Sequence, residues 1–249
     1  MKHGRTGTYF GYAAAAAIVL VAVIAILMFR DRSPSRPANT AGVSTSSLLV
    51  ITWAPSLCKV DRSNSGCRSG HVGRLGQSFV LHGLWPQPST EQYCEVPKGT
   101  PDRDRQPVAL PPDLQASLKA MMSDSAIMTT HEWYAHGTCS GVTPPEYFGV
   151  AAALADQAGR VLDPVFKQAA GQQISARLVR QVVDAQLGAG TGKRVGLSCR
   201  DASGAGSIAY EVRFSLPPVA QIQRDRPSLA DALAGGPTVG PGCGQAGVP

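Results

Sequence analysis

The strongest signal in this sequence is the stretch FVLHGLWPQ (Phe79–Gln87), followed about fifty residues later by HEWYAHGTCS (His131–Ser140). The chain has 249 residues and only five histidines, and three of them, His82, His131 and His136, fall in these two segments. The first segment opens as an apolar run typical of a buried strand. If that strand carries His82 towards the second segment, three imidazoles and the carboxylate of Glu132 meet in one site.

The pattern around these segments predicts a mixed fold. Apolar runs indicate strands at 48–53, 79–82, 194–200 and 207–216, and helical periodicity indicates helices at 114–128, 145–162 and 176–187. Residues 62–76 and the tail from Gly235 are polar or rich in Gly and Pro, and we expect both to be irregular. Strands and helices do not alternate as in βαβ units. The sequence therefore predicts an α+β domain with a central, mainly antiparallel sheet flanked by helices.

The N-terminal part of the chain has the composition of a membrane segment. Residues 11–29 form an uncharged stretch of 19 residues, which nearly matches a hydrocarbon core of roughly 30 Å, with basic residues on both sides. We expect an uncleaved signal anchor that contacts the membrane, with a cleaved signal peptide as the alternative. The predicted organisation is a cytoplasmic head at 1–10, the anchor at 11–29, a flexible Ser/Pro-rich linker at 30–47 and one folded domain at 48–249.

The net charge of +6 suggests nucleic-acid binding, but its distribution weakens that argument. Up to Pro37 the chain carries five basic residues and one acidic residue, so about +2 is left for the rest. Most of the basic excess therefore borders the membrane segment. We expect substrate binding to depend on local contacts more than on long-range attraction.

The chain has six cysteines, and all of them follow the predicted membrane segment. An even number of cysteines in an exported chain is typical of disulfides in an oxidising compartment. The alternative is six buried thiols in a cytosolic protein, and no CxxC pair favours a zinc site. We therefore expect the domain to lie on the periplasmic or extracellular face, anchored or secreted.

The spacing of the histidines in the second segment argues against a metal. His131 and His136 are five residues apart, which on a continuous helix separates them by about 140°. Glu132 and His136 are four apart and share a face. Two imidazoles with a pKa near 6.5 can exchange the roles of general base and general acid. This is what metal-free RNA cleavage requires, because the 2′-OH loses a proton while the departing 5′-oxygen gains one.

HGLWP at 82–86 and HEWxxHGTC at 131–139 together resemble the two active-site segments of the ribonuclease T2 family, secreted and vacuolar acid ribonucleases that include plant self-incompatibility ribonucleases. The resemblance covers roughly 48–243. It implies that His82 is the general acid, that His136 is the general base, and that Glu132 organises the transition state. It also implies that His131 contacts the scissile phosphate and that Trp85 flanks His82 and the substrate.

The resemblance further implies an endoribonuclease that acts on single-stranded RNA with low base specificity, through a 2′,3′-cyclic phosphate to a 3′-phosphate. No metal, cofactor or DNA substrate is expected, and we expect a monomer. Gln87 and Tyr93 are candidate base contacts. Three disulfides are implied, namely Cys94–Cys139, Cys199–Cys243 and, as the remaining pair, Cys58–Cys67.

One residue departs from the family pattern. The family usually has a lysine immediately before the second catalytic histidine, and this chain has Ala135. Loss of one preorganised donor commonly costs 10²–10³ in rate. We therefore expect an active but slower enzyme. The alternatives are a catalytically weakened RNA-binding or signalling protein of the same fold, and a metal-dependent phosphodiesterase, for which the ligand spacing is unsuitable.

Overall fold

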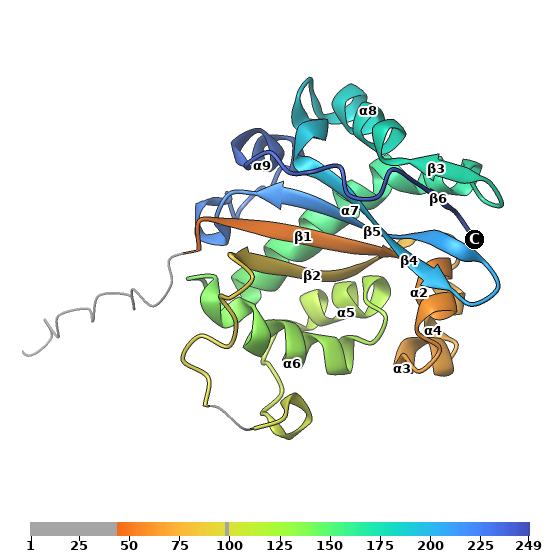
Figure 1. Ribbon diagram of the computed structural model, residues 1–249. Helices are drawn as coiled ribbons and strands as arrows, with labels where there is room; N and C mark the ends of the chain where they lie inside the picture. The colour runs from red at the N-terminus through yellow and green to blue at the C-terminus, as the bar shows by residue number, and fades with distance from the viewer. Residues whose placement is uncertain (1–43, 98–99) are drawn as a thin grey trace, which may run out of the picture. The chain divides into compact units, whose positions relative to one another are not determined.

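A six-stranded sheet forms the centre of the domain (Figure 1). The computed structural model describes residues 44–97 and 100–249. The order of the paired strands is β2-β1-β5-β6-β3, and β4 pairs with the other side of β5. Every pairing is antiparallel except that of β5 with β6. The predicted α+β fold with a mainly antiparallel sheet is confirmed. The strands are β1 (Ser46–Trp53), β2 (Phe79–Gln87), β3 (Gln173–Ser175), β4 (Val195–Ala202), β5 (Gly206–Leu216) and β6 (Gln245–Gly247).

The core lies between this sheet and the long helix α7 (Pro144–Gln168), which crosses behind β1 in Figure 1. Leu49, Ile51 and Trp53 alternate along β1 and are fully buried in this core. The ring of Trp53 contacts that of Phe166 on α7, with 5.2 Å between their centroids. Because successive residues of a strand face opposite sides, the other face of the sheet is left for the site.

Two helices, α5 (Pro112–Met121) and α6 (Ser125–Ala135), lie along the β2 edge of the sheet (Figure 1). The sequence predicted one helix over 114–128, and that prediction is wrong. The chain breaks at Met122, whose backbone bridges to Leu81 of β2, and it restarts at Asp124, whose side chain caps the new helix by accepting from the Ile127 N–H. The break turns α6 so that its C-terminal end reaches β2.

Residues 62–76 are largely helical rather than irregular. They contain α3 (Ser65–Arg68) and α4 (His71–Leu75), which follow α2 (Ala54–Val60). The Cys58–Cys67 disulfide joins α2 to α3. Helices this short are marginal by themselves, and their periodicity is too brief to be read from sequence. The disulfide and a small apolar cluster hold them in place.

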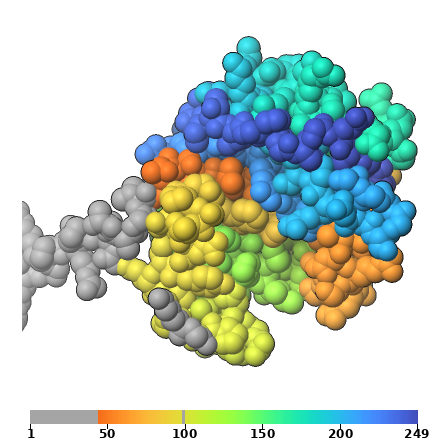
Figure 2. Space-filling model, viewed as in Figure 1, coloured from red at the N-terminus to blue at the C-terminus, as the bar shows by residue number. Residues whose placement is uncertain are grey.

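The C-terminal tail is also more regular than expected. It runs as a dark blue band across the surface in Figure 2, and it ends in β6, which pairs with β3. Pro241 and Cys243 exchange backbone hydrogen bonds with Leu197 of β4. The remaining helices are α8 (Ala176–Leu187), bounded by Ser175 and Gly188 as predicted, and α9 (Leu229–Gly235). The tail therefore lies beside β4 at Leu197 and then, as β6, pairs with both β5 and β3.

The structure contains three disulfides, Cys58–Cys67, Cys94–Cys139 and Cys199–Cys243, which are the pairs that the resemblance implies. Cys94–Cys139 joins the loop after β2 to the 3-10 turn Gly137–Cys139 that follows α6, so it lies beside both sequence segments. No cysteine in the described residues is free.

The domain begins slightly earlier than predicted. Ser46 and Ser47 belong to β1 and are buried, so the predicted linker at 30–47 extends too far. The hydroxyl of Ser47 donates to the Pro217 carbonyl over 2.7 Å, which lets a polar residue occupy a buried strand position. The predicted head at 1–10 and anchor at 11–29 lie outside the described residues. Within 44–97 and 100–249, no helix is long and apolar enough to cross a bilayer.

Candidate active site

A bulge in β2 presents His82 to the site. Ile51 of β1 pairs with Leu81, but its neighbour Val50 pairs with Gly83, so His82 is an extra residue in β2. Leu81 faces the core, while His82 and Gly83 both lie on the opposite face. The bulge therefore directs the His82 imidazole away from α7 and towards β5 and α6.

Gly83 makes room for the carboxylate of Glu132. A Cβ atom at Gly83 would lie 1.9 Å from Glu132 Oε2 and 2.5 Å from Trp85 Nε1. In the space it leaves, the Trp85 indole N–H donates to Glu132 Oε2 over 2.9 Å. The Glu132 side chain is buried, and within the described residues its Oε1 has no hydrogen-bond partner. Burial raises the pKa of Glu132 above its ordinary value.

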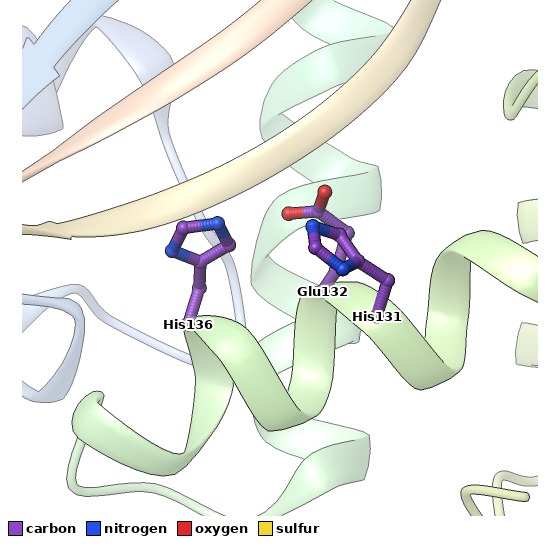
Figure 3. A group of neighbouring side chains, drawn as sticks. All are labelled: His131, Glu132 and His136. Atoms are coloured by element: carbon purple, nitrogen blue, oxygen red, sulfur yellow. The ribbon is translucent and has the colours of Figure 1, made fainter. Parts of the chain in front are cut away.

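The end of α6 brings His131, Glu132 and His136 together, as Figure 3 shows. The helix ends at Ala135, and His136 is its C-cap with φ −126° and ψ −50°. The prediction that His131 and His136 point about 140° apart is therefore wrong, because it assumed a continuous helix. Their ring centroids lie 6.0 Å apart, and one ligand atom from each of the three residues lies within 4.8 Å of the others. Sequence spacing thus does not exclude a metal ion at these residues.

His82 has a buried carboxylate partner that the sequence analysis missed. Its Nδ1 donates to Glu211 Oε1 on β5 over 2.9 Å, and Arg213 donates to Glu211 Oε2 over 3.0 Å. Burial by itself lowers the pKa of His82, but the hydrogen bond to Glu211 and the charges of Glu132 and Glu211 outweigh it and raise the pKa. The only sequence signal was a lone glutamate within the apolar alternation of 207–216.

His131 has a more exposed partner in the loop after β2. Its Nδ1 donates to Asp102 Oδ2 over 2.6 Å, and Asp102 also accepts from Arg105 Nε at 3.0 Å and from the Tyr93 hydroxyl at 3.2 Å. Burial tends to raise the pKa of Asp102, but the bonds from His131 and Arg105 lower it. Asp102 lies in a polar stretch without periodicity, so the sequence analysis missed it as well.

His136 has an environment opposite to that of His82. It is 9% exposed, and its Nδ1 is buried without a hydrogen-bond partner in the described part of the chain. Burial, together with the charges of His131 and His82, lowers the pKa of His136 to about 4. The Trp85 ring lies beside both His82 and His136, with its centroid 5.1 Å from that of His82 and 5.4 Å from that of His136. The site therefore holds one imidazole whose pKa is raised, His82, and one whose pKa is lowered, His136.

Gln87 and Tyr93, the candidate base contacts, and Ala135, at the family's lysine position, each make local contacts. Gln87 lies at the end of β2, and its amide donates to the carbonyls of Pro86 and Trp85 rather than to a catalytic side chain. Tyr93 is partly exposed, and its hydroxyl donates to Asp102. Ala135 is only 1% exposed, and its carbonyl accepts from the Tyr93 N–H, so the loop after β2 lies against the position of the missing lysine.

The sequence matches the model of the Ribonuclease T2 family over residues 45–228, and the chain belongs to this family. It is an endoribonuclease of the T2 type. It is 30% identical to ribonuclease MC of Momordica charantia over 158 residues, which are 61% of this chain and 77% of that protein. It is also 30% identical to a ribonuclease of Aeromonas hydrophila over 106 residues, 43% of this chain and 42% of that protein.

Solved structures share the fold. RNase NT, crystallised with 5′-AMP, superposes with a TM-score of 0.53 at 20% identity, over 71% of this chain and 87% of that one. The self-incompatibility-associated SF11-RNase of Nicotiana alata has a TM-score of 0.52 at 18% identity, over 71% and 89%. These similarities, together with the family match, identify the open sheet and its flanking helices as the T2 ribonuclease fold.

Proposed function

We propose that this endoribonuclease cleaves single-stranded RNA by general acid–base catalysis between His82 and His136. His136 removes the proton from the ribose 2′-OH, and O2′ attacks phosphorus. The bond from phosphorus to O5′ breaks, and His82 delivers its proton to O5′. The product is a 2′,3′-cyclic phosphate. Water then opens the ring with the two histidines in exchanged roles and leaves a 3′-phosphate.

The observation that supports these roles is the opposite treatment of the two imidazoles. An acid must hold a proton and a base must lack one at the same pH, and the pKa of His82 is raised while that of His136 is lowered to about 4. Activity should fall at acid pH as His136 becomes protonated, and at alkaline pH as His82 loses its proton. The environments thus favour a bell-shaped dependence of kcat/KM on pH.

Glu132 and His131 complete the reaction centre in this proposal. The phosphorane develops negative charge, which donors stabilise. Burial raises the pKa of Glu132 and so favours its carboxylic form, which can donate its proton to a phosphate oxygen through the unpartnered Oε1. His131, whose Nδ1 is held by Asp102, contributes its other ring nitrogen to the phosphate.

The substrate and location follow from the same chemistry. Attack by O2′ requires ribose, so DNA is inert, and an accessible 2′-OH and splayed bases favour single-stranded RNA. The local hydrogen bonds of Gln87 support low base specificity. The disulfides require an oxidising compartment, so we place the domain on the exported side, held by residues 11–29 if these form an anchor, and acting as a monomer.

The test uses the full chain with homopolymeric RNA and with DNA, with and without EDTA. We expect EDTA-resistant cleavage of RNA, a cyclic-phosphate intermediate and no cleavage of DNA. His82→Ala and His136→Ala should each lose 10²–10⁴ in kcat/KM, while Asp201→Asn, an exposed residue of β4 outside this site, should retain activity. Cleavage that stops in EDTA would contradict the proposal and would favour a metal at His131, Glu132 and His136 instead.

The alternative, a weakened RNA-binding protein, is supported by one observation. Ala135 provides no cation, and its side chain is buried, so a neighbouring residue would have to occupy that role. The same experiment separates the two functions. Tight RNA binding without a cyclic-phosphate product in the wild-type chain would favour the alternative.

A further inference from the structure

A buried carboxylate lies directly behind His82. The Glu211 side chain is 3% exposed, and each of its oxygens accepts one hydrogen bond, from His82 Nδ1 at 2.9 Å and from Arg213 Nη2 at 3.0 Å. Arg213 itself is 40% exposed and lies two residues along β5 on the same face. The three residues form a continuous chain from the surface to the reaction centre.

The position of Glu211 in the sheet makes its role specific. It pairs with Thr52 of β1 and Ser198 of β4 in the middle of β5, between fully buried apolar strand residues. A charged carboxylate in such a place is costly unless it is paired and hydrogen-bonded. Its two partners, His82 and Arg213, lie on the same face of the sheet as the Glu211 side chain. The fold therefore keeps this charge between His82 and Arg213.

We propose that Glu211 is a positioning residue for His82, and that Arg213 holds Glu211 in place. This inference rests on the proposed function, in which His82 is the general acid. By accepting the Nδ1–H, Glu211 fixes the tautomer and orientation of the imidazole, as an orienting carboxylate does in a histidine dyad. The Nε2 atom is then the one that carries a proton to O5′. The β2 bulge is what brings His82 within reach of β5.

Several charged groups face His82, and the test must separate Glu211 from them. Arg213 also lies on β5, Glu132 and His136 lie at α6, and Asp61 after α2 lines the same small cavity as His82. Glu132 and Glu211 favour the protonated imidazole, whereas Arg213 disfavours it. Removal of Glu211 and removal of Arg213 should therefore have opposite effects.

The experiment compares Glu211→Gln, Arg213→Gln and, as a matched control, Asp201→Asn, an exposed carboxylate on the adjacent strand β4. Glutamine preserves the shape of Glu211 and removes its charge. In Glu211→Gln we expect kcat to fall about tenfold or more, and the alkaline limb of the kcat/KM profile to move about 1–3 pH units lower. Arg213→Gln removes the positive charge but keeps an amide that can donate to Glu211, so it should move that limb higher, and Asp201→Asn should leave it unchanged. A purely structural role would lower activity without moving the limb, and that result would overturn the inference.

An NMR titration of the His82 imidazole, assigned by its absence in His82→Ala, keeps this inference separate from the proposed function. It reads the His82 protonation equilibrium whether or not the protein cleaves RNA. A lower titration midpoint in Glu211→Gln with folded, disulfide-intact protein supports the positioning role, even in an inactive chain. An unchanged midpoint in both Glu211→Gln and Arg213→Gln overturns it, even in an active enzyme.

Discussion

The two sides of the site treat their histidines in opposite ways. On the sheet side, His82 extends from a bulged strand and meets a buried carboxylate that is itself held by an arginine. On the helix side, His136 lies at the end of α6, buried and without a partner for its Nδ1 in the described chain. A strand in the middle of a sheet can place a distant charge beside an imidazole, whereas a helix end exposes its residues mainly to its own neighbours. The same side chain therefore has a raised pKa on one side and a lowered pKa on the other.

The largest expected difference between the two sides is in the free energy of unfolding at acid pH. The folded-state pKa of His136 is about 4, below its unfolded value of about 6.5, so the fold rejects a proton that the unfolded chain accepts. Its contribution to stability is therefore complete above pH 6.5 and is lost as the pH falls through 4. That loss amounts to roughly 3 kcal/mol.

Urea denaturation of the wild type and of His136→Gln between pH 4 and pH 7 measures this contribution. The free energies of unfolding should diverge by that amount as the pH falls, with the wild type losing more. The His82→Gln variant is the contrasting control, because the pKa of His82 is raised and its contribution to stability is instead lost as the pH rises. Parallel curves for wild type and His136→Gln would mean that the fold does not lower the pKa of His136.

The next effect tests the contact that joins the two sides. In Gly83→Ala the new Cβ meets the Glu132 carboxylate, which must move away from Trp85. We expect a loss of roughly 1–3 kcal/mol in the free energy of unfolding from overpacking. A displacement of the reaction centre by about 1 Å should also cost about 10² in kcat/KM.

Gly73→Ala on α4 is the control for this substitution, since a Cβ there has nothing within 4 Å. It should not lower activity. Thermal unfolding and initial rates on the same preparations give both quantities. If Gly83→Ala kept wild-type activity, the close approach of β2 and α6 would not matter for catalysis.

The smallest effect concerns the second carboxylate–histidine pair. Asp102 and His131 are 24% and 40% exposed, so solvent screens their interaction far more than that of Glu211 and His82. We expect Asp102→Asn to lower kcat/KM by less than about fivefold. Asp104→Asn, an exposed carboxylate two residues further on, is the control and should have no effect.

Initial rates at one pH are sufficient for this comparison. A loss of 10² or more in Asp102→Asn would place His131 beside His82 in importance. It would then point to His131, held by Asp102, as the donor that replaces the lysine missing at position 135.

Sequence signals were sufficient to predict the family, the α+β class and the presence of disulfides between the six cysteines. They also predicted that His82, Glu132 and His136 are catalytic, and the structure places all three side chains around Trp85. These predictions follow from local signals, because the apolar runs, the Ser175 cap with Gly188 and the two motifs are each contained in a short stretch of chain. The predicted single helix at 114–128 was wrong because the bridge from Met122 to Leu81 depends on a partner about forty residues away.

The tertiary structure alone decided how the histidines differ. Glu211 is 129 residues from His82 in sequence, and only the register of β1, β2 and β5, with its bulge, brings the two together. The cap conformation of His136 is likewise a property of the helix end and cannot be read from a helical projection. A protonation preference depends on burial and on charges contributed by distant strands and loops. The two motifs therefore predict which residues react, and the fold sets how strongly each imidazole holds a proton.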